Sequence, residues 1–592
     1  MTREIKKVGV IGLGTMGGGM IEVFARAGIE TVGIEIDEEA MKKARRFVEN
    51  STAKAVADEK MAEDERQAIL GRITLSLDLK DVAGADIVIE AVPEDIELKR
   101  EIFQALDDIV GFDAILCTNS SALSVTDMAM STANPQRVMG MHFFNPVPVQ
   151  KLVEVIQTVV TDPQVVRDVR ALAERLGKQP IIAGDSPGFI ANALLMGYIN
   201  HAVMMFQNKY ATREDIDAAM QLGCGYPIGP LALADLVGLD TCYAILDTMY
   251  DVSGRRLHSP APIFKQMMSA GMNGRKTGRG FYTYEKEGSG KVVADKLTPA
   301  PRGEGVEGLR PISKVGVIGN GTMAMGIVEV FVKAGYDTTF VARSQEKADK
   351  GLAGLTKSLD RALSKGRMSQ EKYDAALALA HPSDTVDSLG DVDIVVEAIA
   401  EELPIKIDMF ERLDKVCKPG AILATTTSSL PVVEIAAATS RPEDVIGMHF
   451  FNPAAVMKLV EIVSTVLTGK DVRDTVDDLC AKIGKRPVDC GDQSGFIVNA
   501  LLFPYLNDAI NMLGRHYASA DQIDTAMKLG CSLPMGPFEL LDVVGLDVSL
   551  AIQNELWTEF RDAGFKPAAL LEHLVKGGYL GRKTGHGFRS YR

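Results

Sequence analysis

The sequence predicts an α/β plus all-α protein of two tandem units, each a Rossmann-type doubly wound parallel sheet followed by a helical domain. Three observations predict this fold: short apolar runs alternate with helical patterns, a glycine-rich turn follows the first run, and the landmarks recur at one spacing. His142 returns as His449, and since 449 − 142 = 307, the same difference relates Gly12 to Gly319. The units are therefore two copies of one design without net insertion between these points.

The composition is that of a globular enzyme with several domains. The 592 residues are 46% hydrophobic and 24% charged, and the formal net charge of −15 argues against general affinity for nucleic acid or anionic membranes. No apolar run reaches the ~18–20 residues of a membrane span. The first strand pattern starts within a few residues of the N-terminus, and the seven cysteines form no Cys-x-x-Cys pair. We expect a cytoplasmic protein without a structural zinc or a disulfide framework, and no metal site.

The first strand and its turn indicate a dinucleotide site. The apolar run 8–11 leads into Gly12-Leu13-Gly14-Thr15-Met16-Gly17, a helical stretch follows, and the second strand ends at Glu35. Glycines there let the backbone approach a pyrophosphate at a helix N-terminus, and the acid would bind a ribose hydroxyl. The first unit should therefore bind NAD. A purely structural glycine turn is the alternative.

The next elements bring polar residues to strand ends. Residues 38–72 predict a helical hairpin, and the buried strands 86–92 and 114–118 are followed by Glu94 and by Asn119-Ser120-Ser121. Because the carboxyl ends of parallel strands face the ligand crevice, these residues are site candidates. Ser121 could instead cap the helix after it.

His142 ends a further strand, and Glu154 lies on the following strand, 152–156. A histidine beside two phenylalanines is often only a half-buried residue with its hydrogen bonds satisfied, so the neighbours must decide its role.

The pattern changes at residue 185. Asp185-Ser186-Pro187 predicts the start of a long amphipathic helix containing Asn192, and helices continue to about residue 281. Residues 287–310 have linker composition. We expect Rossmann domains at 1–184 and 311–491, helical domains at 185–286 and 492–592, and the linker between the two units.

Both units resemble 3-hydroxyacyl-CoA dehydrogenases, including bacterial 3-hydroxybutyryl-CoA dehydrogenases. The motifs that carry the resemblance are residues 142–146 with 151–154, 119–121, 185–192 and 226–230. It implies interconversion of (S)-3-hydroxyacyl-CoA and 3-oxoacyl-CoA, short-chain substrates such as 3-hydroxybutyryl-CoA, and the cofactor NAD(P). The catalytic residues it implies are His142, Glu154, Ser121 and Asn192, with His449, Glu461, Ser428 and Asn499 in the second unit.

The resemblance also implies the binding residues. The cofactor set is Gly12, Gly14, Thr15, Met16, Gly17, Glu35, Glu94, Lys99, Asn119, Asn145 and Lys276, with Gly319, Gly321, Thr322, Met323, Ala324, Arg343, Ser344, Glu401, Lys406, Asn452 and Lys583. The set for coenzyme A is Ser51, Lys54, Lys60, Ser358 and Lys365. Glu94 and Lys99 could alternatively form a surface ion pair at a helix start.

The implied residues suit the implied chemistry. Oxidising a secondary alcohol needs a base for the hydroxyl proton, and histidine titrates near neutrality. Glu154 would orient the ring and stabilise its protonated form. Ser121 and Asn192 could donate hydrogen bonds to the substrate oxygens.

Some positions depart from the family pattern. Family members usually have arginine after the motif asparagine, where Ala193 and Ala500 stand, and Asp58 replaces a basic residue of the coenzyme A set. Two other functions stay open: a 3-hydroxyisobutyrate-type dehydrogenase, suggested by residues 12–17 but lacking its catalytic lysine, and a cofactor-binding homologue without activity.

The two units differ most at the cofactor. The 307-residue offset aligns Glu35 with Ala342, so the acid that repels a 2′-phosphate is lost, and Arg343 and Ser344 follow. We expect NAD in the first unit and NAD or NADP in the second, although Arg343 could be merely solvated. The apolar helical faces 194–198 and 501–505 should pack together, making the chain an intramolecular pseudo-dimer, with a higher homo-oligomer left open.

Overall fold

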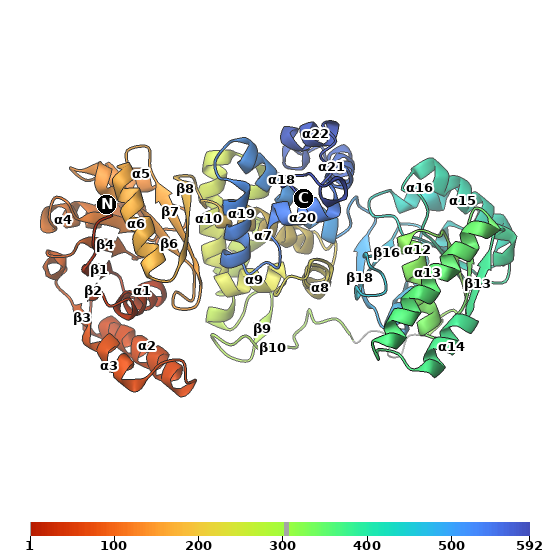
Figure 1. Ribbon diagram of the computed structural model, residues 1–592, viewed down its shortest axis with the longest axis horizontal. Helices are drawn as coiled ribbons and strands as arrows, with labels where there is room; N and C mark the ends of the chain where they lie inside the picture. Colours follow the sequence, from red (N-terminus) through yellow and green to blue (C-terminus); the bar gives the residue numbers. More distant parts are fainter. Residues whose placement is uncertain (1, 301–306, 592) are drawn as a thin grey trace.

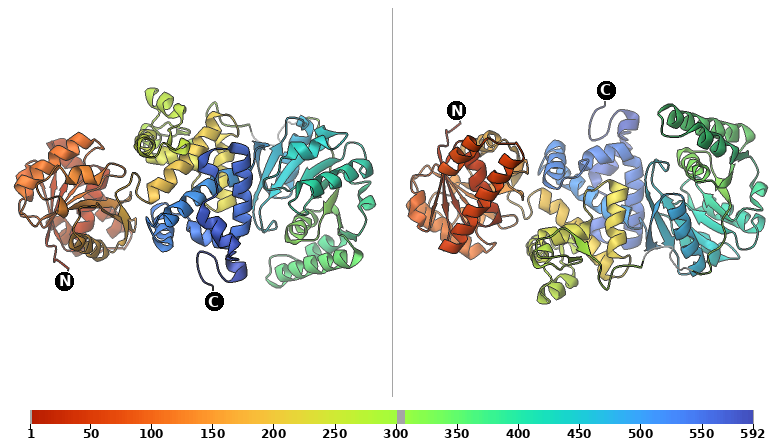
Figure 2. Two further views of the ribbon diagram at one scale, coloured as in Figure 1. Left: turned by 90° about the horizontal axis from the view of Figure 1, so that it is seen from above. Right: turned by 90° about the horizontal axis from the view of Figure 1, so that it is seen from below.

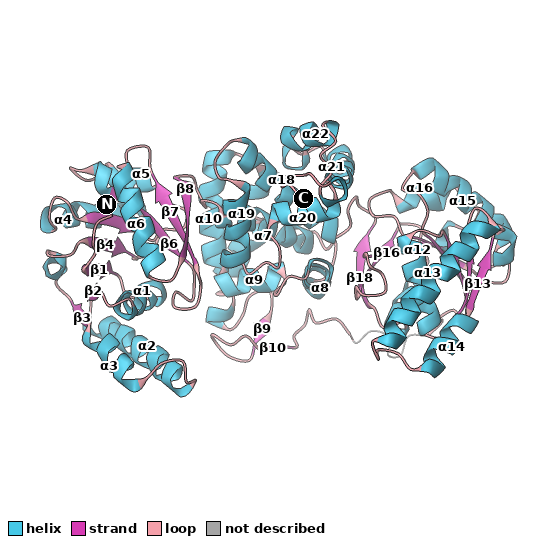
Figure 3. Ribbon diagram, viewed as in Figure 1, coloured by secondary structure: helices cyan, strands magenta, loops and turns pink. Residues whose placement is uncertain are grey.

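The computed structural model describes residues 2–300 and 307–591, and it confirms the predicted fold class (Figures 1 and 3). The first unit contains β1 (Lys7–Ile11), α1 (Thr15–Arg26), β2 (Glu30–Ile34), α2 (Glu38–Ala57), α3 (Glu63–Gly71), β3 (Ile73–Ser76), β4 (Ile87–Glu90), α4 (Ile96–Ile109), β5 (Ile115–Thr118), α5 (Val125–Ala129), β6 (Val138–Phe143), β7 (Leu152–Gln157), α6 (Pro163–Arg175), β8 (Gln179–Gly184), α7 (Ala191–Gln207), α8 (Arg213–Cys224), α9 (Pro230–Val237), α10 (Leu239–Ser253), α11 (Pro262–Ser269), β9 (Thr283–Tyr284) and β10 (Val292–Val293).

The second unit repeats this order. It contains β11 (Lys314–Ile318), α12 (Thr322–Lys333), β12 (Asp337–Val341), α13 (Gln345–Ser364), α14 (Gln370–Ala378), β13 (Ala380–Ser383), β14 (Ile394–Glu397), α15 (Leu403–Val416), β15 (Ile422–Thr425), α16 (Val432–Ala437), β16 (Val445–Phe450), β17 (Leu459–Ser464), α17 (Lys470–Lys482), β18 (Arg486–Gly491), α18 (Val498–Gly514), α19 (Ala520–Gly530), α20 (Pro537–Val544), α21 (Leu546–Phe560) and α22 (Ala569–Lys576).

The sheet of each Rossmann domain has eight strands and one reversal of direction. The first has the order β3-β2-β1-β4-β5-β6-β7-β8, and β6 pairs antiparallel with β7, whereas its other neighbouring strands pair in parallel. The predicted parallel sheet is therefore mostly parallel. Strands β1, β4 and β5 are apolar throughout their centres because helices cover both faces. Figure 2 shows these layers from two further sides.

The helical domains of the two units pack against each other at the centre of the molecule (Figure 1). Helix α7 lies against α18, and Tyr198 and Tyr505 bring their rings to 6.3 Å. This is the intramolecular pairing expected from the apolar helical faces. No helix among the described residues is both long and apolar enough to cross a membrane.

Each helical domain also covers the sheet edge of the other unit. Helix α19 lies against β7 and β8, and α8 lies against β17 and β18. The Tyr517 hydroxyl donates to the Gly184 carbonyl at 2.6 Å, and the Tyr210 hydroxyl donates to the Gly491 carbonyl at 2.7 Å. Covering an edge strand removes a surface that could pair with another chain.

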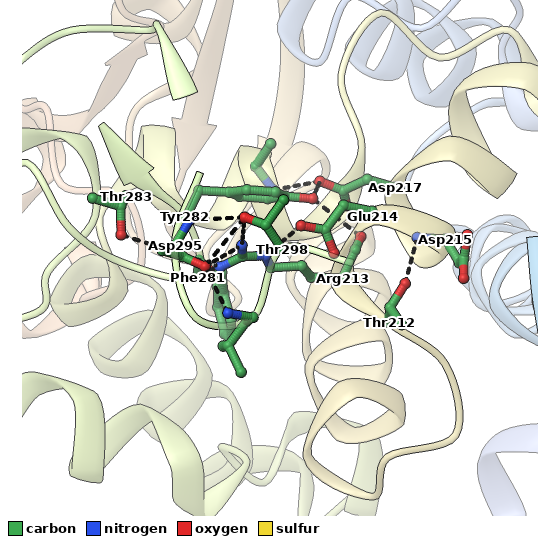
Figure 4. Close-up of polar contacts among 12 residues, drawn as sticks. Thr212, Arg213, Glu214, Asp215, Asp217, Phe281, Tyr282, Thr283, Asp295 and Thr298 are labelled. Carbon is green, nitrogen blue, oxygen red and sulfur yellow. Dashed lines mark hydrogen bonds and ion pairs between the residues drawn. The ribbon is translucent and has the colours of Figure 1, made fainter. Parts of the chain in front are cut away.

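The segment expected to be a linker is anchored on both sides. Its first part forms β10 and then binds Arg213 of α8, whose guanidinium donates to both carboxylate oxygens of Asp295 at 2.9 and 2.6 Å and to the Phe281 carbonyl (Figure 4). The Arg213 hydrogen bond holds the pKa of Asp295 well below its usual range. Arg310 pairs with Asp444 and Asp471 of the second Rossmann domain.

We expect Asp295→Ala to accelerate proteolytic cleavage within residues 287–313 several-fold, because a bidentate contact to a buried guanidinium is lost. Limited proteolysis followed by mass spectrometry measures the rate and the position of cleavage. Glu285→Ala is the control, since its pair with Lys291 is exposed and worth little. Equal cleavage rates in the two variants would contradict the anchoring role of Arg213.

Candidate active site

A histidine–glutamate pair lies across β6 and β7. His142 and Glu154 are register partners in the antiparallel ladder, which sets their side chains side by side, and His142 Nδ1 is 2.7 Å from Glu154 Oε2. The second unit repeats the pair, with 2.7 Å between His449 Nδ1 and Glu461 Oε2. The reversal of strand direction between β6 and β7 therefore creates this pair.

The second oxygen of Glu154 binds the start of α7. Glu154 Oε1 accepts from the backbone N–H groups of Ile190 at 3.1 Å and Ala191 at 2.9 Å, and the side chain is fully buried. A carboxylate is stabilised there because the first N–H groups of a helix have no partner within the helix. Glu461 binds Ile497 and Val498 in the same way. The carboxylate thus joins the sheet to the helical domain.

The hydrogen bond to Glu154 leaves the other ring nitrogen of His142 for chemistry. Because Nδ1–H donates to the carboxylate, the neutral ring carries its lone pair on Nε2. Phe144 and Phe189 hold the ring, with centroids at 4.7 and 5.6 Å from that of the imidazole. A base held in this way can accept a proton from a hydroxyl group.

The predicted start of α7 is wrong. The helix begins at Ala191 and not at Ser186-Pro187, because Gly188 and Phe189 adopt left-handed φ angles of 78° and 51°. Asp185 caps another helix, accepting from the N–H groups of Val125 and Thr126 in α5. The left-handed turn returns the chain so that the first N–H groups of α7 point at Glu154.

Ser121 is held by Glu94. The Ser121 N–H and hydroxyl donate to Glu94 Oε1 at 2.7 and 3.1 Å. The alternative role of Ser121 as a helix cap is wrong, because Ser124 caps α5. In the second unit Ser428 binds Glu401 at the same distances. Burial alone would raise the pKa of Glu401, but Lys406 and these hydrogen bonds outweigh it and lower the pKa.

Lys99 is buried, so the alternative of a surface ion pair is wrong. Its side chain is 1% exposed and its ammonium lies 2.7 Å from Glu90 Oε1 and 3.6 Å from Glu94. Sequence reasoning missed Glu90, whose only signal is a charge at the end of an apolar strand. Burial raises the pKa of Glu90, and Lys99 opposes the shift. Lys406 and Glu397 repeat the buried pair.

The glycine-rich turn fits a dinucleotide. A Cβ on Gly17 would lie 1.9 Å from the Gly12 carbonyl, so α1 can approach the turn only with glycine there, while Gly14 has open space around it. The first turn of α1 carries no acid that would repel a pyrophosphate. Glu35 Oε1 accepts from the Leu13 N–H at 2.8 Å, which places its carboxylate beside this turn.

The second unit tolerates Ala324 where Gly17 stands in the first. Gly319 shifts to a φ of 127°, against 84° for Gly12. Ser344 has a structural role: its hydroxyl accepts from the Lys347 N–H and caps α13, as Asp37 caps α2. Arg343 is exposed.

The remaining expected residues lie at varied places. Asn119 accepts from the Phe143 N–H and so links the ends of β5 and β6. Asn192 is half-buried in the first turn of α7, Asn499 donates to the Ser428 carbonyl, and Asn145 is exposed. The two lysines form ion pairs, Lys276 with Asp240 and Lys583 with Asp547. Of the coenzyme A set, Ser51 and Lys54 lie on α2, Lys60 pairs with Asp58, Ser358 donates to Glu329, and Lys365 ends α13. Among residues 2–300 and 307–591, no hydrogen bond or ion pair joins that set to the histidine–glutamate pairs.

Comparisons with known proteins match both units to the same two domain families. Residues 7–186 and 314–493 match the NAD-binding domain of 3-hydroxyacyl-CoA dehydrogenase, and residues 188–284 and 495–591 match the C-terminal domain of that enzyme. A 3-hydroxybutyryl-CoA dehydrogenase of Clostridioides difficile is 47% identical over 280 residues, which is 47% of this chain and 99% of that protein. The human mitochondrial hydroxyacyl-coenzyme A dehydrogenase is 39% identical over 289 residues, covering 48% of this chain and 92% of that protein.

A solved structure matches both units together. The crystal structure of 3-hydroxybutyryl-CoA dehydrogenase from Escherichia coli K12 is 25% identical, covers 98% of this chain and 100% of that chain, and has a TM-score of 0.69. The tandem arrangement is therefore shared with another protein over nearly its whole length.

We expect Glu154→Gln, in a chain carrying His449→Ala, to lower kcat about 10²–10⁴-fold, because the amide cannot accept from both His142 and the start of α7. Steady-state kinetics measure kcat, and a fluorescence titration measures NADH binding, which should change little. Glu97→Gln, at an exposed ion pair of the same domain, is the matched control. A fall smaller than threefold would refute the orienting role of Glu154.

Proposed function

This chain belongs to the 3-hydroxyacyl-CoA dehydrogenase family, and we propose that each unit interconverts (S)-3-hydroxyacyl-CoA and 3-oxoacyl-CoA, with acyl groups such as 3-hydroxybutyryl. The observation that carries the proposal is the pair of His142 with a Glu154 carboxylate fixed by α7, repeated in the second unit at the same distance. Both units keep the pair, which favours two active sites over a homologue that only binds cofactor.

In the oxidative direction the substrate hydroxyl passes its proton to His142 Nε2. The imidazolium that forms is stabilised by Glu154, whose carboxylate remains bound at Nδ1. A nicotinamide cofactor, when bound, would supply the acceptor for the hydride that leaves the substrate carbon. In the reductive direction the same nitrogen returns the proton to the oxygen. The protein thus moves one proton at one defined atom.

Ser121 and Asn192 complete the proposed site. Ser121 follows β5, which pairs with β6, and Asn192 lies in the helical turn that binds Glu154. The Asn192 amide can donate to the substrate oxygens, where negative charge develops as a carbonyl is reduced. The Ser121 hydroxyl can do so by turning its one hydrogen away from Glu94, while its N–H keeps the bond to that carboxylate. Glu94 positions Ser121 through two hydrogen bonds.

We further propose that the units use different cofactors, NAD in the first and NADP as well as NAD in the second. Glu35 sets a carboxylate beside the glycine-rich turn of the first unit. Ala342 replaces it, and the exposed guanidinium of Arg343 follows directly, so a 2′-phosphate would meet a cation in place of an anion.

We expect the wild-type chain to oxidise NADH with acetoacetyl-CoA, and the double variant His142→Ala plus His449→Ala to keep less than a few per cent of that activity. The base is removed from both sites, while the cofactor turn is untouched. Absorbance measures turnover and NADH fluorescence measures binding. Substantial turnover in the double variant would sink the assignment; activity with 3-hydroxyisobutyrate instead would favour the alternative function.

We expect the variant His142→Ala, which leaves only the second site, to use NADPH at least as well as NADH. Adding Ala342→Glu should shift kcat/KM toward NADH by more than tenfold, because a carboxylate then repels the 2′-phosphate. Arg367→Ala, distant along the chain from the cofactor turn, controls for general loss of positive charge. If His142→Ala alone strongly prefers NADH, Arg343 does not recognise the phosphate.

A further inference from the structure

A cavity of about 380 Å³ lies where the first unit meets α18 of the second. Its walls come from the loop at Pro187 and Phe189, from α7 at Ala193, from the end of α10 at Val252, and from Met512 and Tyr517 of the second unit. Its volume lies within the ~300–1,000 Å³ typical of small-molecule pockets. The lining is mostly apolar, and Val252 is 72% exposed at its mouth.

The cavity adjoins the candidate active site at Phe189. Phe189 is both a wall of the cavity and a neighbour of His142, with ring centroids 5.6 Å apart. Ala193, another wall, directly follows Asn192, and both are half-buried. An acyl chain that extends from a substrate at His142 past Phe189, on the side of the helical domain, would reach this cavity.

The ion pair between Arg255 and Asp508 bounds the cavity. It joins α18 of the second unit to the first unit, with 2.5 Å between Arg255 Nη2 and Asp508 Oδ1. Since the walls come from both units, the cavity exists only when the two helical domains are paired.

In the second unit larger side chains stand at two of the matching positions. Glu559 stands where Val252 stands in the first unit, and its carboxylate accepts from the Ser494 N–H at 2.8 Å. The first unit cannot form that bond because Pro187 holds the position of Ser494 and has no N–H. Phe560, in place of Ser253, stacks on Phe565 at 4.7 Å.

The two sites differ in exposure accordingly. Asn499 is 8% exposed and Ala500 is 1% exposed, whereas Asn192 and Ala193 are half-buried. We propose that the first unit acts on 3-hydroxyacyl-CoA esters with medium-length acyl chains, whose apolar tails lie in this cavity, and that the second unit is confined to short chains. The inference rests on the proposed function of both sites.

The test compares the units within the full chain. His449→Ala leaves the first site and His142→Ala leaves the second, and kcat/KM is measured for acetoacetyl-CoA and 3-oxooctanoyl-CoA. Each methylene buried contributes about fourfold to binding. The ratio of kcat/KM for 3-oxooctanoyl-CoA to kcat/KM for acetoacetyl-CoA should therefore be more than tenfold higher for the first site than for the second.

Two exchanges of residues locate the cause. Glu559→Val with Phe560→Ser, in the His142→Ala chain, should raise that ratio more than tenfold. Pro187→Ser with Val252→Glu, in the His449→Ala chain, should lower it similarly. Asp251→Phe adds bulk at an exposed neighbour that does not line the cavity, and it should leave the ratio unchanged. Thermal unfolding verifies that each variant is folded.

Equal ratios for the two single-site chains would overturn the inference, and so would exchanges that alter both substrates alike. If neither single-site chain reduces acetoacetyl-CoA, the proposed function itself fails, and this inference with it. If both single-site chains reduce acetoacetyl-CoA but show the same preference for chain length, only the proposed role of the cavity fails.

Discussion

The site depends on one buried carboxylate that is shared between two domains. One oxygen of Glu154 fixes the tautomer of His142, and the other accepts from the first N–H groups of α7. A fully buried carboxylate is costly unless every lone pair has a partner, and here the partners are a histidine and a helix N-terminus. Any movement of the helical domain relative to the sheet must therefore disturb the base.

The sequence was sufficient for the composition of the site but not for its geometry. The resemblance to a known family, carried by motifs that both units repeat, implied that His142 and Glu154 are partners. The antiparallel pairing that sets them opposite each other was not readable, because β6 and β7 are both apolar runs whatever their direction. Proline after Asp185 suggested a helix start, yet the left-handed Phe189 delays the helix to Ala191.

Burial of charge was the other feature hidden from the sequence. Lysine is seldom fully buried, so a surface pair of Lys99 with Glu94 stayed open beside their expected contact with the cofactor. The structure instead buries its ammonium beside Glu90 and 3.6 Å from Glu94, the carboxylate that binds Ser121. The pairing depends on how α4 packs beside β4, and the spacing of nine residues between the two charges does not predict it. The same arrangement in the second unit, at Lys406 and Glu397, indicates a shared support for the loop that carries the serine.

The pairing of the two helical domains brings together two sets of aligned positions, which we call the two junctions. Because both units lie in one chain, the two junctions can differ, and they carry different charges. At one junction Arg255 pairs with the buried Asp508. At the other, the aligned positions hold Asp562 and His201, and burial lowers the pKa of His201 to about 4, so the ring is neutral near pH 7. Two second units joined in the same way would set Asp508 against Asp562, leaving two acids without the arginine that now compensates the buried one. The junction chemistry thus matches a first unit to a second, and residues of both units in that pairing line the cavity beside Phe189.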